Sequence, residues 1–78
     1  MNQRNDKGQR QGYWERYYLD GELKNKGNYI NGKKDGHWSW YTNGGNIWYK
    51  GNYINGDRDG YWEWYHINGN LIEKEFVL

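Results

Sequence analysis

The 78-residue sequence lacks cysteine and proline and contains only one methionine and one phenylalanine. Without cysteine, the chain has neither a disulfide framework nor a thiolate metal site. Long apolar runs are also absent, which argues against a signal peptide or a membrane-spanning helix. The net charge of +1 gives no strong field toward nucleic acid. We therefore expect one small soluble domain that is not addressed for export, with no cofactor and no metal.

Aliphatic side chains are scarce as well, and the apolar material is aromatic, with six tryptophans and nine tyrosines. Each such ring buries ~150–250 Å² while keeping a polar tip in water, so a thin structure can be held together by rings alone. No helical period is visible, and twelve glycines disfavour helix. The composition therefore predicts an all-β protein with an aromatic core.

The chain repeats itself every 24 residues, and the run KGNYING occurs identically at 26–32 and 50–56. A period in this range indicates a repeat architecture with one supersecondary unit per copy. We expect a polar segment at 1–11, either an eroded repeat or disordered, and a repeat domain at 12–78 with copies at 12–35, 36–59 and 60–78. The residues that coincide are Gly12, Gly36 and Gly60; Trp14, Trp38 and Trp62; and Tyr17, Tyr41 and Tyr65.

Two kinds of turn signal alternate along each copy. One is a glycine-containing pair at 20–21, 44–45 and 68–69, which predicts two-residue hairpin turns. The other is the longer polar stretch at 31–34 and 55–58, which we interpret as a four-residue loop. These signals predict an antiparallel meander of about six strands, near 12–19, 22–30, 36–43, 46–54, 60–67 and 70–78.

Both turn lengths lead to the same register, in which Trp38 lies opposite Gly27 on one side and Gly51 on the other. A ring over a cross-strand glycine covers a residue that otherwise weakens a strand. The predicted core is this row with two tyrosines: Trp14, Gly27, Trp38, Gly51, Trp62, Tyr29 and Tyr53. The opposite face carries a solvated ladder (Glu15, Lys26, Ser39, Lys50, Glu63, Lys74), flanked by a row of rings and one lysine (Tyr17, Lys24, Tyr41, Trp48, Tyr65, Ile72).

The pattern G-x-W-x-x-Y, then G-x-L/I, then K-G-x-Y-x-N-G-x-x-D-G resembles the MORN repeat, in its bacterial variant. The resemblance covers 12–78. It implies an elongated, twisted single-layer antiparallel sheet with one hairpin per repeat and a non-enzymatic role in protein contacts. With this resemblance we expect a cytoplasmic chain, in a bacterium or a phage-infected host cell. Membrane-lipid binding is proposed for some eukaryotic members, and bacterial chains of this kind are often labelled antitoxin- or immunity-like. The chain departs from this pattern in two ways: the third copy stops at Leu78, and Glu75 replaces the glycine.

Catalytic, metal-binding and membrane-binding residues are not expected. The two histidines, His37 and His66, point to opposite faces in the predicted register, and no cluster of ligands accompanies them. Asp35 and Asp59 end a turn before glycine, where aspartate commonly bonds to backbone N–H groups. The lysines and arginine of the longer loops form no dense basic patch, so no membrane partner is expected.

The exposed rings are the candidate binding residues, because a single-layer sheet leaves one face wet and exposed aromatic patches mark interaction sites. We expect a protein partner and an inhibitor-like role, as in an immunity protein, an antitoxin or a phage-borne anti-defence protein. The alternatives are single-stranded nucleic acid or carbohydrate on the same rings, and a homodimer or scaffold formed through the edge strand at 75–78. The predicted partner-binding residues are Tyr13, Tyr17, Lys24, Tyr41, Trp48, Tyr61 and Tyr65.

Overall fold

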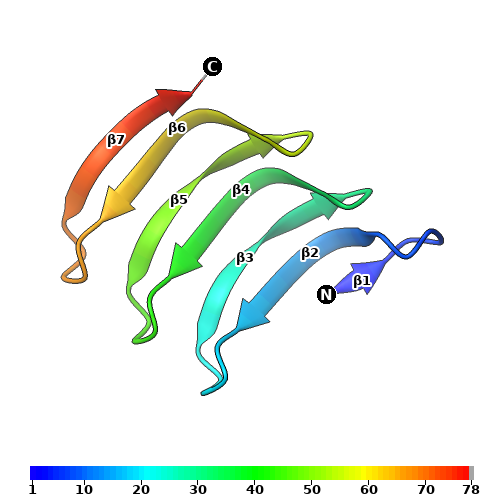
Figure 1. The fold of residues 1–78 in the computed structure, drawn as a ribbon, viewed down its shortest axis with the longest axis horizontal. Helices are drawn as coiled ribbons and strands as arrows, with labels where there is room; N and C mark the ends of the chain where they lie inside the picture. The colour runs from blue at the N-terminus through cyan, green and yellow to red at the C-terminus, as the bar shows by residue number, and fades with distance from the viewer. Residues whose placement is uncertain (78) are drawn as a thin grey trace.

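A computed structural model describes residues 1–77 of the chain. These residues form one sheet of seven antiparallel strands, in which each strand pairs with the next along the chain (Figure 1). The sheet is 12 Å thick along its shortest axis, which corresponds to a single layer. The strands are β1 (Gln3–Arg4), β2 (Arg10–Tyr17), β3 (Leu23–Ile30), β4 (Lys33–Tyr41), β5 (Ile47–Ile54), β6 (Asp57–Tyr65) and β7 (Leu71–Val77).

The single-layer antiparallel meander is confirmed, whereas the number of about six strands is wrong. The additional strand is β1, which lies in the polar segment at 1–11 and pairs with the start of β2. A turn at 5–8 connects the two, closed by a hydrogen bond from the Gly8 amide to the Asn5 carbonyl. Leu78, the end of the third predicted copy, lies outside the described residues.

The Asn-Gly turns are shorter than the four-residue loops expected from the sequence. Asn31 and Gly32 have φ values of 50° and 83°, which is the two-residue type I′ turn that Asn-Gly favours. As a result, Ile30 pairs with Lys33 rather than with Asp35. The two residues saved in the turn reappear as a bulge, since positions 36–38 all lie opposite Gly27. Beyond this bulge the register is the predicted one.

The other hairpins have three-residue loops, so the prediction of two-residue turns is also wrong. In the first of them, the Gly21 amide donates to the Tyr18 carbonyl and the Tyr18 amide donates to the Glu22 carbonyl. This is a type I turn followed by a left-handed glycine. A bulge at position 24 restores the register, and positions 48 and 72 repeat it. Tyr17, Tyr41 and Tyr65 therefore lie opposite Leu23, Ile47 and Leu71, not opposite Lys24, Trp48 and Ile72.

The predicted row of tryptophans over glycines is confirmed and forms the core. A Cβ atom on Gly27 would lie 2.1 Å from Cδ2 of Trp38, and one on Gly51 would lie 2.1 Å from Cδ2 of Trp62. Each indole thus rests on the backbone of the preceding strand, in a space that only glycine leaves open. Trp38 and Trp62 are 0% and 1% exposed although no second layer covers them.

The two edges of the sheet differ in how they end. On the β2 edge, the Asn2 side chain accepts a hydrogen bond from the Glu15 amide (2.8 Å) and donates one to the Glu15 carbonyl (2.9 Å). The Trp14 indole donates to the Gln3 carbonyl. On the other edge, β7 pairs only with β6 among residues 1–77, and its residues 71–76 are exposed. Within this range, the N-terminal segment covers one edge of the sheet, and no strand pairs with the other.

Candidate functional site

Side chains alternate between the two faces of a strand, so each β-strand here contributes to both faces. We call the face opposite the core tryptophans the tyrosine face. Its central row crosses six strands and consists of Glu15, Lys26, Ser39, Lys50, Glu63 and Lys74. All five neighbouring pairs of this row have the predicted register. The tyrosine face includes Tyr13, Glu15, Tyr17, Lys26, His37, Ser39, Tyr41, Lys50, Tyr61, Glu63, Tyr65, Lys74 and Phe76.

Glu15 in the first repeat holds two tyrosine hydroxyls. Tyr13 donates a hydrogen bond of 2.8 Å to Oε2, and Tyr17 donates to Oε1. The hydrogen bonds from Tyr17 and Tyr13 lower the pKa of Glu15. Burial, followed by the bond to Glu15, raises the pKa of Tyr13 to about 12. The carboxylate therefore fixes both rings by charge-assisted hydrogen bonds, while Tyr13 and Tyr17 remain 39% and 51% exposed.

Glu63 plays the corresponding role in the third repeat. It accepts a hydrogen bond of 2.7 Å from the Tyr65 hydroxyl, and the ammonium groups of Lys50 and Lys74 each lie 3.8 Å from one of its oxygens. The bond from Tyr65 is the main cause that lowers the pKa of Glu63. Burial and that same bond raise the pKa of Tyr65 to about 12. One carboxylate thus connects three strands.

The second repeat has a different centre, because Ser39 occupies the position of the two glutamates. Ser39 is 4% exposed, and its Oγ lies 3.2 Å from Nε2 of His37. Burial, followed by the charges of Lys50 and Lys26, lowers the pKa of His37. The Lys26 ammonium lies 5.8 Å from the centre of the Tyr41 ring. Here a small neutral side chain therefore stands between two lysines.

Five of the seven predicted binding residues lie on the tyrosine face, namely Tyr13, Tyr17, Tyr41, Tyr61 and Tyr65. The Tyr61 ring packs against Phe76 at 4.9 Å and lies 4.7 Å from the Lys74 ammonium.

Lys24 and Trp48 are not brought to these tyrosines. The Lys24 ammonium lies over the Tyr18 ring, and Trp48 packs edge-on against Tyr49, whose ring stacks on Trp40. The bulges at 24 and 48 are the reason, and the sequence gives no sign of them apart from the loop length.

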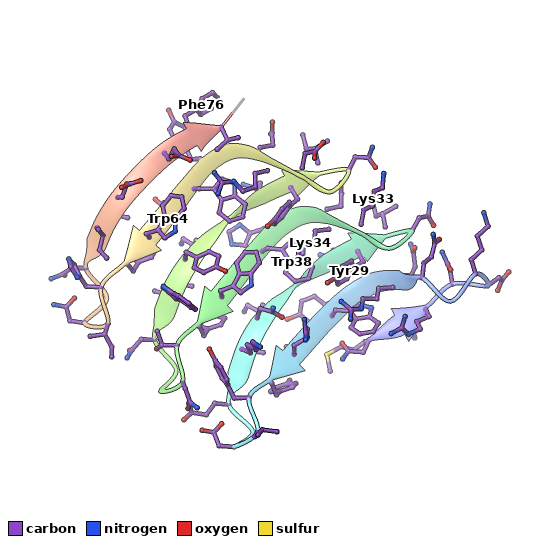
Figure 2. The ribbon with its side chains drawn as sticks, viewed as in Figure 1. Tyr29, Lys33, Lys34, Trp38, Trp64 and Phe76 are labelled. Carbon is purple, nitrogen blue, oxygen red and sulfur yellow. The ribbon has the colours of Figure 1, made fainter. Side chains whose placement is uncertain are left out.

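Cations on the tryptophan face were missed by the sequence reasoning. Arg10, Lys34 and Arg58 each lie over the tryptophan four residues later, at 5.0, 5.4 and 5.0 Å from the ring centre. Figure 2 shows Lys34 beside Tyr29 and Trp38 near the middle of the sheet. The signal was available, because a basic residue precedes each core tryptophan by four positions at the 24-residue period. These side chains cover the rings and give the face a charged outer surface.

The part of the chain that the structure describes contains neither a metal site nor a membrane-spanning helix. Residues 1–77 contain no group of three or more histidine, aspartate or glutamate side chains placed to hold a metal ion. The same residues include no helix with the length and apolar character needed to cross a bilayer. The tyrosine face is therefore the candidate site.

An open sheet built from successive similar hairpins defines a repeat protein, in which each unit contacts only its neighbours. The family described as MORN repeat variant matches this chain at residues 10–31, 34–55 and 58–77. The chain belongs to that family. No curated protein and no solved structure is significantly similar to it.

Proposed function

We propose that this chain is a non-enzymatic binding module that blocks a partner protein, in the manner of an immunity protein, an antitoxin or a phage-borne anti-defence protein. The partner docks on the tyrosine face. The observation that carries the proposal is the gathering of five tyrosines from three alternate strands, β2, β4 and β6, on one face of the sheet. Tyrosine supplies contact area at a low cost in conformational entropy, which suits it to interfaces.

Rigidity of the rings supports this proposal. The hydroxyls of Tyr13, Tyr17 and Tyr65 are bound to carboxylates on their own strands. A side chain that is already ordered loses less entropy when a partner covers it, so more of the contact energy remains for affinity. The mixed charges of the central row add polar groups that can select one partner over another.

The test is capture and inhibition of the partner. The purified chain is used to capture proteins from its source cells, and a captured protein is then assayed with the pure chain added back. We expect stoichiometric inhibition by the wild type and loss of both capture and inhibition by the triple variant Tyr17→Ala, Tyr41→Ala and Tyr65→Ala. A matched control is Leu19→Ala with Ile67→Ala, which removes exposed apolar side chains in hairpin loops outside the strands. Equal inhibition by the triple variant, once shown to be folded, overturns the proposal.

Assembly through β7 is a second candidate, favoured by the open edge described above. This strand exposes its backbone together with Leu71, Ile72 and Phe76. An exposed edge of this kind pairs readily with another chain. Light scattering after size exclusion tests it: a concentration-dependent dimer that is lost when Ile72→Lys is introduced supports assembly. A monomer at every concentration contradicts it and leaves the blocking function in place.

A further inference from the structure

The central row of the tyrosine face alternates acid and base with one exception. Glu15 faces Lys26, and Glu63 faces both Lys50 and Lys74, but Ser39 lies between Lys26 and Lys50. The row therefore contains three lysines and two glutamates. The missing carboxylate is the one at the centre, where a strand on either side presents a cation. Lys26 and Lys50 lie two strand spacings apart, roughly 9.5 Å along the sheet.

The groups around this gap match those that hold a carboxylate elsewhere in the chain. In the third repeat, Glu63 takes a hydrogen bond from the tyrosine two residues later and lies beside two lysines. In the second repeat, the corresponding positions around residue 39 hold Tyr41, Lys26 and Lys50. The Lys26 ammonium lies over the Tyr41 ring, whereas the Lys50 ammonium lies 3.8 Å from Glu63. Ser39 and His37 add polar atoms, 3.2 Å apart, on the same face. The residue types that surround Glu63 thus recur around Ser39 without a carboxylate, and a carboxylate bound there would share Lys50 with Glu63.

We propose that this gap binds an aspartate or glutamate side chain of the partner protein, which completes the row between Lys26 and Lys50. The inference rests on the proposed function and names the chemistry of the contact at the centre of the tyrosine face. A carboxylate is preferred over a larger anion because the two other members of the row at this position are carboxylates, in the same strand geometry. Charge-assisted hydrogen bonds to such a group are strong and directional.

The probe is a short oligoglutamate peptide, with oligoglutamine as its uncharged control, titrated into isotope-labelled protein at low ionic strength. We expect amide shifts centred on Lys26, Ser39 and Lys50, and their disappearance in high salt, because exposed charges are screened. Shifts centred instead on Arg10, Lys34 and Arg58 overturn the assignment of the site. Tighter binding of phosphoserine peptides than of oligoglutamate overturns the assignment of its ligand.

Ser39→Glu supplies the missing carboxylate from the chain itself and should weaken oligoglutamate binding at least tenfold, which corresponds to about 1.4 kcal/mol. Asn46→Glu adds the same charge in the exposed loop before β5, outside the row, where the first copy already carries Glu22, and should bind nearly as the wild type does. Because a glutamate at the buried position 39 can disturb folding, the double variant Lys26→Gln with Lys50→Gln provides an independent loss of binding. Wild-type affinity in either the folded Ser39→Glu variant or this double variant contradicts the proposal.

The partner assay separates this inference from the proposed function. If the triple tyrosine variant loses the partner while Ser39→Glu retains it, the blocking function stands and the carboxylate site is wrong. If oligoglutamate binds at Ser39 but loss of the tyrosines leaves partner inhibition intact, the carboxylate site stands and the proposed docking on the tyrosine face is wrong. Loss of the partner in both variants, with Asn46→Glu unaffected, supports both.

Discussion

The two faces of this sheet use aromatic rings in opposite ways. On the tryptophan face, Trp38 and Trp62 lie flat on glycine backbones and are almost completely buried within a single layer. On the other face, Tyr17 and Tyr61 remain more than half exposed, and hydrogen bonds or neighbouring charges order the tyrosines there. The difference shows how a chain of this size makes a core without a second layer. One face supplies the stability, and the other is left free for contacts.

The largest effect is expected from Trp38→Ala. This substitution empties the space over Gly27 and removes the edge-to-face contact with Tyr29 at 4.9 Å. We expect a loss of about 3–5 kcal/mol in the free energy of unfolding. Urea unfolding followed by circular dichroism measures it. Tyr17→Ala, on the opposite face, is the control and should cost far less; equal losses would contradict the division between the faces.

Gly51→Ala tests the same face by addition instead of removal. The new methyl group would lie 2.1 Å from Cδ2 of Trp62, so the indole has to leave its place. Overpacking of this kind costs about 1–3 kcal/mol. The matched control is Asn52→Ala, one residue along the same strand and exposed on the opposite face. If Gly51→Ala and Asn52→Ala have the same unfolding midpoint, Trp62 has room to move.

The sequence was sufficient for this face because the signals there repeat. Trp38 and Gly27 recur at the same spacing one copy later, and any register that aligned one pair had to align the other. The turns were less predictable. Asp20-Gly21 and Asn31-Gly32 both favour tight turns, and the choice between two and three residues depends on where a bulge is tolerated. A bulge in each hairpin compensated the error in loop length before the tryptophans, but Lys24 lies in one of these bulges and was misplaced.

The candidate site was predictable only as a set of rings. Tyr13, Tyr17 and Tyr65 could be placed on one face by alternation, but their hydrogen bonds to carboxylates on the same strand depend on side-chain geometry. Trp48 was misplaced because a bulge changes the direction of one residue without leaving a mark in composition. The hydrogen bonds of the Asn2 side chain to the Glu15 backbone could not be predicted either. Nothing in a polar terminal segment indicates which side-chain amide pairs with the edge strand.

Tyr65→Phe examines the polar network of the tyrosine face. It removes the hydroxyl that donates 2.7 Å to Glu63 but keeps the ring. We expect a loss of about 0.5–1.5 kcal/mol, near the lower end because water reaches this pair. Thermal unfolding measures the change, with Tyr61→Phe as the control, because the contacts of Tyr61 with Phe76 and Lys74 involve its ring. A loss as large as that of Trp38→Ala would mean that the tyrosine face also belongs to the core.

The smallest effect is the pH dependence of stability that Glu63 and Tyr65 contribute. The pKa of Glu63 is lower in the folded chain than its ordinary value of 4.5, so its contribution is present above that pH and is lost as the pH falls through the folded pKa. The pKa of Tyr65 is raised from 10.0 to about 12, so its contribution is present below pH 10 and is lost as the pH rises toward 12. Glu63→Gln should therefore flatten the acid limb of the stability curve.

The alkaline limb of that variant should flatten only in part. Burial is the first cause that raises the pKa of Tyr65, and the hydrogen bond to Glu63 is the second, so the former remains after Glu63→Gln. The measurement is the urea midpoint as a function of pH for the wild type and the variant. Two curves that stay parallel at both extremes would show that the hydroxyls of the tyrosine face are not held in solution. If a partner docks on this face as proposed, it would then have to order the Tyr65 ring on binding, at a cost in affinity.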